Sequence, residues 1–179
     1  MENIETVIVG AGQSGLATAQ RLRNRGRECV ILDHNQRIGD GWRRQWDSLR
    51  LYSPAKFDGL PGQRFPADPW SFPTKDDVAA YLEAYAGRWD LPVRHGTRVG
   101  GLAQDTDDGF VVTTDAGPIH CDNVVVARHL RKDTRDPRLR PGPGSLHPAA
   151  ALQRVPATRA APGPGTRHGS RAFATGSRS

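Results

Sequence analysis

Three things that this sequence of 179 residues lacks or has little of argue against whole classes of protein: long apolar runs, a basic N-terminal start and cysteine. No run of about eighteen apolar residues is present, so we expect neither a transmembrane span nor a membrane partner. The first five residues lack the basic start of a secretory signal, so we expect a cytoplasmic protein. Only two cysteines occur, Cys29 and Cys121, with no C-x-x-C pair and no histidine cluster beside them. We interpret both as buried thiols rather than a metal or redox site, while a pairing between them stays open.

Glutamate is absent from the last 52 residues, and charge is divided unevenly along the chain. Residues 1–127 carry fourteen Lys or Arg and seventeen Asp or Glu, whereas residues 128–179 carry eleven and two. The formal net charge of +6 therefore belongs to the tail, and nucleic acid is not indicated as a partner of the rest. The tail is rich in Arg, Ala, Pro and Gly without an apolar period. We expect a folded domain at residues 1–127 and an unstructured tail at residues 128–179.

What the sequence does contain is a dinucleotide-binding fingerprint in its full context. An apolar strand at residues 6–9 runs into Gly10-Ala11-Gly12-Gln13-Ser14-Gly15, and a helical stretch follows. A second apolar strand at residues 29–32 then leads to Asp33, eighteen residues after Gly15. This order of strand, G-x-G-x-x-G, helix, strand and acid predicts a βαβ unit that binds an ADP-containing cofactor.

Each residue type in the fingerprint has a mechanical reason. Gly10 permits a tight turn, Gly12 lets a pyrophosphate approach the backbone, and Gly15 lets the helix pack close to the sheet. The free N–H groups and partial positive charge of the helix N-terminus then face the phosphates. The Asp33 carboxylate can accept hydrogen bonds from the adenosine ribose. The alternative, a merely tight turn with a solvated Asp33, stays open at this point.

The stretch after Asp33 also allows two interpretations. Gly39 and Gly41 flank Asp40 and precede Trp42. The backbone there either passes close to something flat or forms an ordinary turn with Trp42 in the core. Residues 49–70, broken by four prolines, predict an ordered, irregular excursion that packs through its aromatic side chains.

The remaining residues of the domain predict one helix and several strands. Thr74 and Asp77 form a capping box, and an apolar stripe follows that we interpret as core without a chemical role: Val78, Tyr81, Leu82 and Tyr85. Strands are expected at residues 93–99, from about residue 102, and at residues 110–114, 118–121 and 124–127. The order predicts an α/β fold, a Rossmann-like domain whose parallel sheet carries a small antiparallel β meander.

Six motifs occur together in one order and spacing: residues 10–16, 38–42, 51–54, 71–74, 81–86 and 124–127. In this combination, residues 4–127 resemble the N-terminal FAD-binding portion of flavin-containing monooxygenase-like oxidoreductases. These are two-dinucleotide flavoproteins that also include Baeyer–Villiger and N-hydroxylating monooxygenases. The resemblance implies a Rossmann-like FAD-binding domain, incomplete in this chain, and singles out no substrate.

The resemblance also assigns residues to the cofactor. It implies that the FAD pyrophosphate is held by one loop, formed by Gly10, Gly12, Gln13, Ser14 and Gly15. Asp33 would hold the adenosine ribose, and Val99 would contact the adenine through its backbone. Gly41 and Trp42 would lie beside the flavin. The implied chemistry is reduction of FAD by NADPH, reaction with O₂ to a flavin hydroperoxide, and oxygen transfer to a small organic substrate.

The resemblance breaks after Ala127, where family members continue with Thr-Gly and this chain continues with Arg128. A second G-x-G-x-x-G for NADPH is absent from the sequence. We therefore expect a truncated fragment with weak or no turnover. One hypothesis for the tail is a reading-frame shift near Ala127. Permissible codons from Arg128 onward, read one base displaced, yield a continuation that resembles the family's, including a His-Ser-x-x-Tyr element.

Two alternative functions stay open on the sequence. The chain is alternatively a non-enzymatic FAD- or nucleotide-binding module with a basic interaction tail. It is alternatively a flavin reductase of the two-dinucleotide type, because the discriminating residues lie outside the matched portion. The sequence leaves the oligomeric state undecided.

Overall fold

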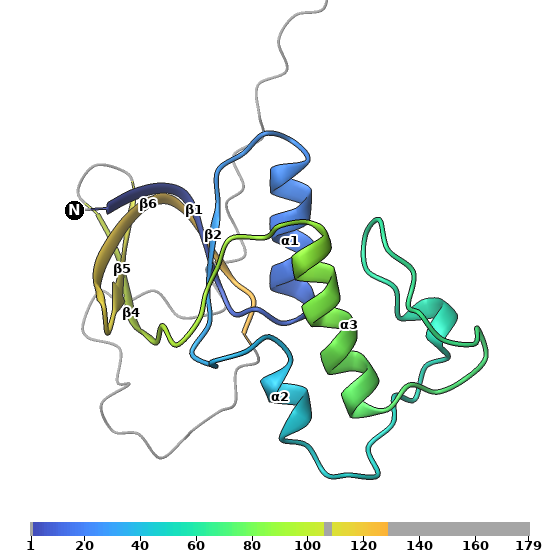
Figure 1. Ribbon diagram of the computed structural model, residues 1–179. Coiled ribbons are helices and arrows are strands. Elements are labelled where there is room, and N and C mark those ends of the chain that lie inside the picture. Colours follow the sequence, from blue (N-terminus) through green and yellow to red (C-terminus); the bar gives the residue numbers. More distant parts are fainter. Residues whose placement is uncertain (1, 106–108, 129–179) are drawn as a thin grey trace, which may run out of the picture. The chain divides into compact units, whose positions relative to one another are not determined.

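The computed structural model describes residues 2–105 and 109–128, which form one mixed sheet with helices packed on it (Figure 1). The strands are β1 (Glu2–Val9), β2 (Val30–Leu32), β3 (Val93–Arg94), β4 (Val99–Gln104), β5 (Phe110–Thr114) and β6 (Gly117–Val126). Their order across the sheet is β3-β2-β1-β6-β5-β4. The first four run parallel, and β6, β5 and β4 form an antiparallel meander. The predicted Rossmann-like α/β fold with its meander is confirmed.

Two strand boundaries differ from the prediction. Strand β3 ends at Arg94 because Gly96 has a φ of +63° and turns the chain, with its N–H donating to the Asn35 carbonyl at 2.9 Å. Strand β4 consequently begins at Val99 rather than near residue 102. The strands predicted at residues 118–121 and 124–127 are one strand, β6. It pairs with β1 over almost its whole length and with β5 only through its first half.

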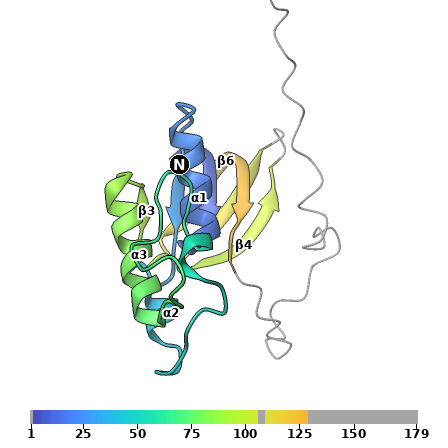
Figure 2. The same cartoon turned by 90° about the vertical axis from the view of Figure 1, so that its right-hand side faces the viewer.

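The helices are α1 (Gln13–Arg23), α2 (Asp40–Arg43) and α3 (Lys75–Arg88), with a 3₁₀ turn at Ala55–Phe57. Figure 2 shows α1 and α3 on the same side of the sheet. The capping box of α3 is present as predicted: the Asp77 N–H donates to Thr74 Oγ1, and the Thr74 N–H donates to Asp77 Oδ2. These reciprocal bonds satisfy two backbone donors that a helix start leaves unpaired.

The core lies on both faces of the sheet because side chains of β1 alternate. Ile8 packs with Leu16 of α1 and Tyr85 of α3, and all three are fully buried. Val7 and Val9 point to the other face, which packs against the meander. The predicted stripe of α3 is core, and burial raises the pKa of Tyr85 to about 12.

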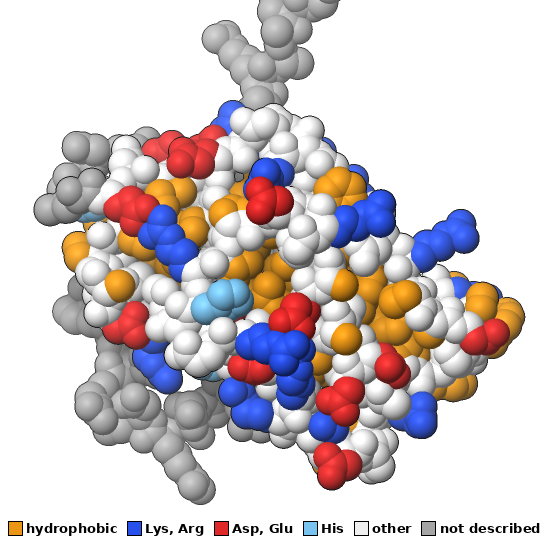
Figure 3. All heavy atoms as spheres, viewed as in Figure 1, with side chains coloured by type: hydrophobic (Ala, Val, Ile, Leu, Met, Phe, Trp, Pro, Cys, Tyr) orange, Lys and Arg blue, Asp and Glu red, His pale blue; other side chains and the backbone are white. Residues whose placement is uncertain are grey.

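Tyrosine hydroxyls of α3 hold the irregular excursion in place. Tyr81 Oη accepts the Leu60 N–H at 2.7 Å and donates to the Gln63 carbonyl at 2.8 Å. Tyr85 Oη donates to the Pro61 carbonyl at 2.8 Å. Hydrophobic side chains nevertheless reach the surface of the excursion (Figure 3), among them Tyr52, Phe57 and Trp70. The excursion is therefore ordered on its inner side, as predicted, and only partly covered on its outer side.

Both cysteines are free and buried, in agreement with the prediction. Cys29 belongs to the core on the helix face, and Cys121 belongs to the core on the opposite face, so the two do not pair. In the described part of the chain, no helix has the length and apolar character needed to cross a membrane. Beyond Arg128, the predicted unstructured tail lies outside the described residues.

Candidate functional site

The glycine-rich loop joins β1 to α1 at the carboxyl end of the parallel strands. Gly10 has a φ of +108°, and its N–H donates to the Leu32 carbonyl at 2.8 Å. A Cβ at Gly10 would lie 3.0 Å from the Ala127 carbonyl oxygen, and a Cβ at Gly15 would lie 1.9 Å from the Gly10 oxygen. The fold therefore requires glycine at positions 10 and 15, the first for the turn and the second for close helix packing.

Gly12 and Gly41 differ from these two glycines. A Cβ built at either position would meet no protein atom within 4 Å. Protein packing does not explain glycine there, whereas close approach of a ligand to the backbone would explain it. Gly12 is also the N-cap of α1 and provides no side-chain cap, and the first turn holds no acidic residue. The N–H groups of that turn are therefore suited to an anion such as a pyrophosphate, and this turn contains Gln13 and Ser14.

Asp33 closes the loop from the side of β2. Its Oδ2 accepts the Ala11 N–H at 2.6 Å, and its Oδ1 accepts the Asn35 N–H at 2.8 Å. The side chain belongs to a residue that is only 9% exposed, so the alternative of a solvated Asp33 is wrong. A carboxylate has about four acceptor positions, so two amide donors leave room for ribose hydroxyls.

The segment before β4 lies against Asp33. The Asp33 N–H donates to the Arg94 carbonyl at 3.0 Å, and the Asp33 carbonyl accepts the Thr97 N–H at 2.9 Å. Val99, two residues further on, is half-buried and packs against the core of the meander face. The structure therefore brings Asp33 and the segment that ends at Val99 together at one end of the sheet.

Helix α2 follows β2 at this same end, where Figure 1 also shows the start of α1. Gly39 has a φ of +86°, and a Cβ there would lie 2.8 Å from the Ala79 backbone of α3. Trp42 is half-buried and packs against the core of the helix face. Of the two interpretations of this stretch, packing explains Gly39 and part of Trp42, and it leaves Gly41 unexplained.

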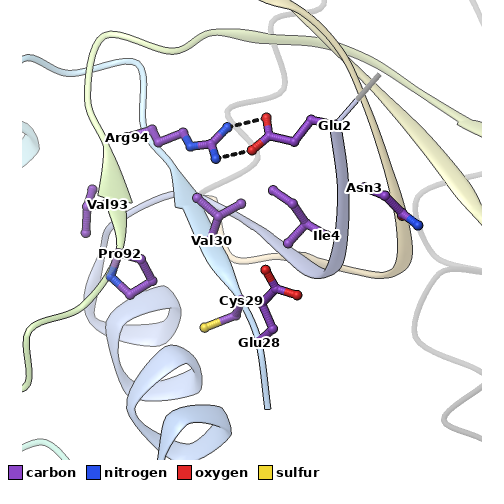
Figure 4. Close-up of a pocket in the computed structure, with 9 residues that line it drawn as sticks. All are labelled: Glu2, Asn3, Ile4, Glu28, Cys29, Val30, Pro92, Val93 and Arg94. Atoms are coloured by element: carbon purple, nitrogen blue, oxygen red, sulfur yellow. Dashed lines mark hydrogen bonds and ion pairs between the residues drawn. The ribbon is translucent and has the colours of Figure 1, made fainter. Parts of the chain in front are cut away.

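A hollow of about 350 Å³ lies at the opposite end of the parallel strands (Figure 4). It is lined by the first residues of β1 and β2, together with Arg94, whose guanidinium forms a two-bond pair with the Glu2 carboxylate. None of the predicted cofactor residues lines it. The candidate site is therefore the carboxyl end of the strands, where open α/β sheets bind their ligands, and not this hollow.

Several residues of the site carry no signal in the sequence. The bond from Ala11 to Asp33 joins residues 22 apart, and Glu83 of α3 binds two arginines of the α2 stretch. Glu83 stands in the motif of residues 81–86, but helical periodicity only marks it as outside the apolar stripe. The contacts appear only once the packing of α3 against α2 is known.

Comparison with known proteins shows which family and which individual proteins this chain is similar to. Residues 7–128 match the model of the pyridine nucleotide-disulphide oxidoreductase family. A CzcO-like oxidoreductase of Geobacillus kaustophilus is 41% identical over 124 residues, 69% of this chain and 35% of that protein. Indole-3-pyruvate monooxygenase YUCCA6 of Arabidopsis thaliana is 40% identical over 112 residues, 62% of this chain and 27% of that protein.

Solved structures agree with these sequence matches. A flavin-containing monooxygenase from Stenotrophomonas maltophilia superposes with a TM-score of 0.64 at 32% identity, covering 71% of this chain and 38% of that chain. The chain spans about a third of the length of the curated relatives it matches. The resemblance predicted from the motifs is confirmed for the N-terminal portion. The chain therefore belongs to the pyridine nucleotide-disulphide oxidoreductase family.

Proposed function

We propose that residues 2–128 bind FAD as the cofactor-binding part of an NAD(P)H-dependent flavin monooxygenase. The observation that carries the proposal is the glycine-rich loop closed by the buried Asp33 carboxylate, 2.6 Å from the Ala11 amide nitrogen. Relatives named as flavin-containing and indole-3-pyruvate monooxygenases support oxygenation over other oxidoreductase chemistry.

The residues present fit FAD from its adenine end to its flavin end. The pyrophosphate would lie at the first turn of α1, on the amides of residues 12–15, where the open space at Gly12 admits it. Asp33 would bind the adenosine ribose through its remaining acceptor positions. The backbone at Val99 would face the adenine, and Gly41 and Trp42 would face the flavin. Open space at Gly41 supports the last assignment.

When bound and reduced by NAD(P)H, FAD would supply the electrons that activate O₂ for transfer of one oxygen atom to a small organic substrate. The described residues would contribute binding and orientation: amides for the phosphates, a carboxylate for the ribose, and helix α2 with Gly41 and Trp42 for the ring. We assign no catalytic side chain and no metal site, and in the described part of the chain no cluster of His, Cys, Asp or Glu could hold a metal ion.

We also propose that the flavoprotein sequence ends near Ala127 and that residues 128–179 arise from a shifted reading frame. The match to the family model ends at residue 128, and the composition changes at the same point; both observations support this boundary. Because the 179 residues contain a single G-x-G-x-x-G, we propose that this chain alone does not oxidise NADPH steadily. Sequencing the gene tests the first proposal, and an NADPH oxidation assay on the purified chain tests the second.

The binding proposal is tested by two matched glycine substitutions. Gly12→Val fills the space reserved for the pyrophosphate, and Gly87→Val of α3 fills a position that also meets no protein atom within 4 Å. We expect Gly12→Val to weaken FAD binding by about tenfold or more and Gly87→Val to leave it unchanged. Fluorescence titration of flavin measures both. Equal FAD affinity in the two variants would contradict the proposal.

A further inference from the structure

Glu83 of α3 is the acceptor at the centre of an ion-pair network beside α2. Arg37 Nε and Nη2 donate to its two carboxylate oxygens at 2.5 and 2.6 Å, and Arg43 Nη2 donates to Oε2 at 3.0 Å. Hydrogen bonding and charge from Arg37, with a smaller contribution from Arg43, hold the pKa of Glu83 below its usual range. Figure 3 shows basic and acidic side chains interleaved over α2 and α3.

The two arginines bracket the stretch of residues 37–43, which contains Gly41 and Trp42. Arg43 also bonds to other residues of this stretch: its Nη1 donates to the Ile38 carbonyl at 2.7 Å and to Asp40 Oδ1 at 3.1 Å. The Glu83 carboxylate therefore holds both ends of the seven-residue segment 37–43, and we call Glu83 with these two arginines the clamp.

Helix α3 contacts this segment at three points along one face. Lys75, buried at 7% exposure, donates from Nζ to the Arg43 carbonyl at 3.1 Å. Ala79 is the residue on which Gly39 packs, and Glu83 binds the two arginines. These three residues are four positions apart, so they lie above one another on the helix. One face of α3 therefore contacts the segment of residues 37–43 on each of three successive turns.

We propose that Glu83 is a positioning residue for the flavin end of the cofactor, fixing the turn that presents Gly41 and Trp42. The inference rests on the proposed function, because FAD is the ligand that this turn would face. Packing against α3 fixes Gly39, whereas the space beside the Gly41 Cα is open, so the placement of Gly41 relative to α3 depends on the ion pairs at the two ends of the segment.

Exposure separates this role from general stabilisation. The Glu83 and Arg37 side chains are 37% and 59% exposed, and exposed ion pairs add little to the stability of a whole domain. Ion pairs that order one short segment instead affect the binding of a ligand that contacts this segment. Loss of the clamp should therefore affect the flavin end of FAD and leave the adenosine end bound as before.

The experiment compares FAD with ADP, which lacks the flavin. In the full chain, Glu83→Gln keeps the size of the side chain and removes its charge. Glu2→Gln is the matched control, because Glu2 also binds an arginine, Arg94, through two bonds but lies at the far end of the strands (Figure 4). Affinities for FAD and ADP are measured by calorimetry, and bound-flavin fluorescence reports how well the ring is held.

We expect Glu83→Gln to weaken FAD binding by roughly 2- to 12-fold, the effect of one side chain that must be ordered on binding. Its ADP affinity should stay within about twofold of wild type, and Glu2→Gln should change neither affinity. The flavin fluorescence of bound FAD should move toward that of free FAD only in Glu83→Gln. Arg43→Gln, which removes the other side of the clamp, should reproduce the same pattern if Glu83→Gln folds poorly.

Three results would overturn the inference. Unchanged affinities for both FAD and ADP in Glu83→Gln and Arg43→Gln, with wild type binding FAD more tightly than ADP, refute the positioning role alone. Equal weakening of FAD and ADP refutes it as well, because it indicates a general loss of structure. If wild type binds neither ligand, the proposed function fails, and the positioning role fails with it.

Discussion

Replacing Asp33 by asparagine removes one of the two carboxylate oxygens that close the glycine-rich loop. Oδ2 accepts the Ala11 N–H at 2.6 Å, and Oδ1 accepts the Asn35 N–H at 2.8 Å. Asparagine has one carbonyl oxygen, so its NH₂ group must face one of these two amide donors. In either orientation, one backbone N–H loses its acceptor at a site that is only 9% exposed.

The magnitude follows from the kind of bond that is lost. A hydrogen bond to a charged acceptor contributes about 1.5–3 kcal/mol, and the orphaned amide cannot be fully hydrated in a buried position. We therefore expect the free energy of unfolding to fall by about 2–3 kcal/mol. The same substitution removes a ribose acceptor, so FAD affinity should fall by about tenfold.

The assay is urea unfolding followed by tryptophan fluorescence, with Asp115→Asn as the matched control. Asp115 is exposed and also accepts a backbone amide, the Arg98 N–H at 3.0 Å; among the described residues this bond to Oδ1 is the one that its carboxylate makes. Asparagine can keep that bond, so we expect a change within about 0.5 kcal/mol. Equal free energies of unfolding for Asp33→Asn and Asp115→Asn would refute the reasoning, because the buried Asp33 would then contribute no more to stability than the exposed Asp115.

Three further predictions concern the loop, the excursion and acid pH. Gly15→Ala should abolish the cooperative unfolding transition measured by circular dichroism, because its Cβ would lie 1.9 Å from the Gly10 oxygen. The control Gly87→Ala, whose Cβ would meet no protein atom within 4 Å, should keep that transition. Tyr81→Phe should lower the free energy of unfolding by about 2–3 kcal/mol, since it leaves the Leu60 N–H and the Gln63 carbonyl without that hydroxyl. Tyr85→Phe removes a hydrogen bond to the Pro61 carbonyl alone and should lower it by about 1 kcal/mol. Equal losses would contradict this assignment. The pKa of Glu83 lies below its ordinary value of 4.5, so its stabilising effect is present above that pH and is lost as the pH falls through the lower folded value. The difference in urea midpoint between wild type and Glu83→Gln, small because the pair is exposed, should therefore shrink on acidification, and a difference that is constant with pH would contradict the ion pairing.

Local signals explain why much of the fold was predictable. The turn at Gly10 follows from a glycine pattern within six residues, and the capping box of Thr74 and Asp77 joins residues three positions apart. The stripe containing Tyr81 and Tyr85 follows the helical period, and its burial needs only one apolar face opposite it. Such features depend on residues close together in the chain, so a single sequence is enough to predict them.

Contacts between distant residues explain what was missed. Asp33 was assigned to a ribose, but its bond to Ala11 depends on how β2 aligns with β1, which the sequence does not reveal. Gly96 ends β3 early because its N–H finds the Asn35 carbonyl, 61 positions earlier in the chain. Glu83 reaches Arg37 and Arg43 across 46 and 40 positions. The partner of each of these groups is fixed by tertiary packing rather than by local propensity.

Competition between ligands tests the central claim, that the glycine-rich loop and Asp33 bind the ADP portion of FAD. The purified chain is titrated with FAD, ADP and FMN, and binding is followed by calorimetry and flavin fluorescence. We predict that FAD binds, that ADP displaces it, and that FMN, which lacks the adenosine, neither binds comparably nor displaces it. FMN binding as tightly as FAD, or FAD binding that ADP leaves unchanged, would contradict the account.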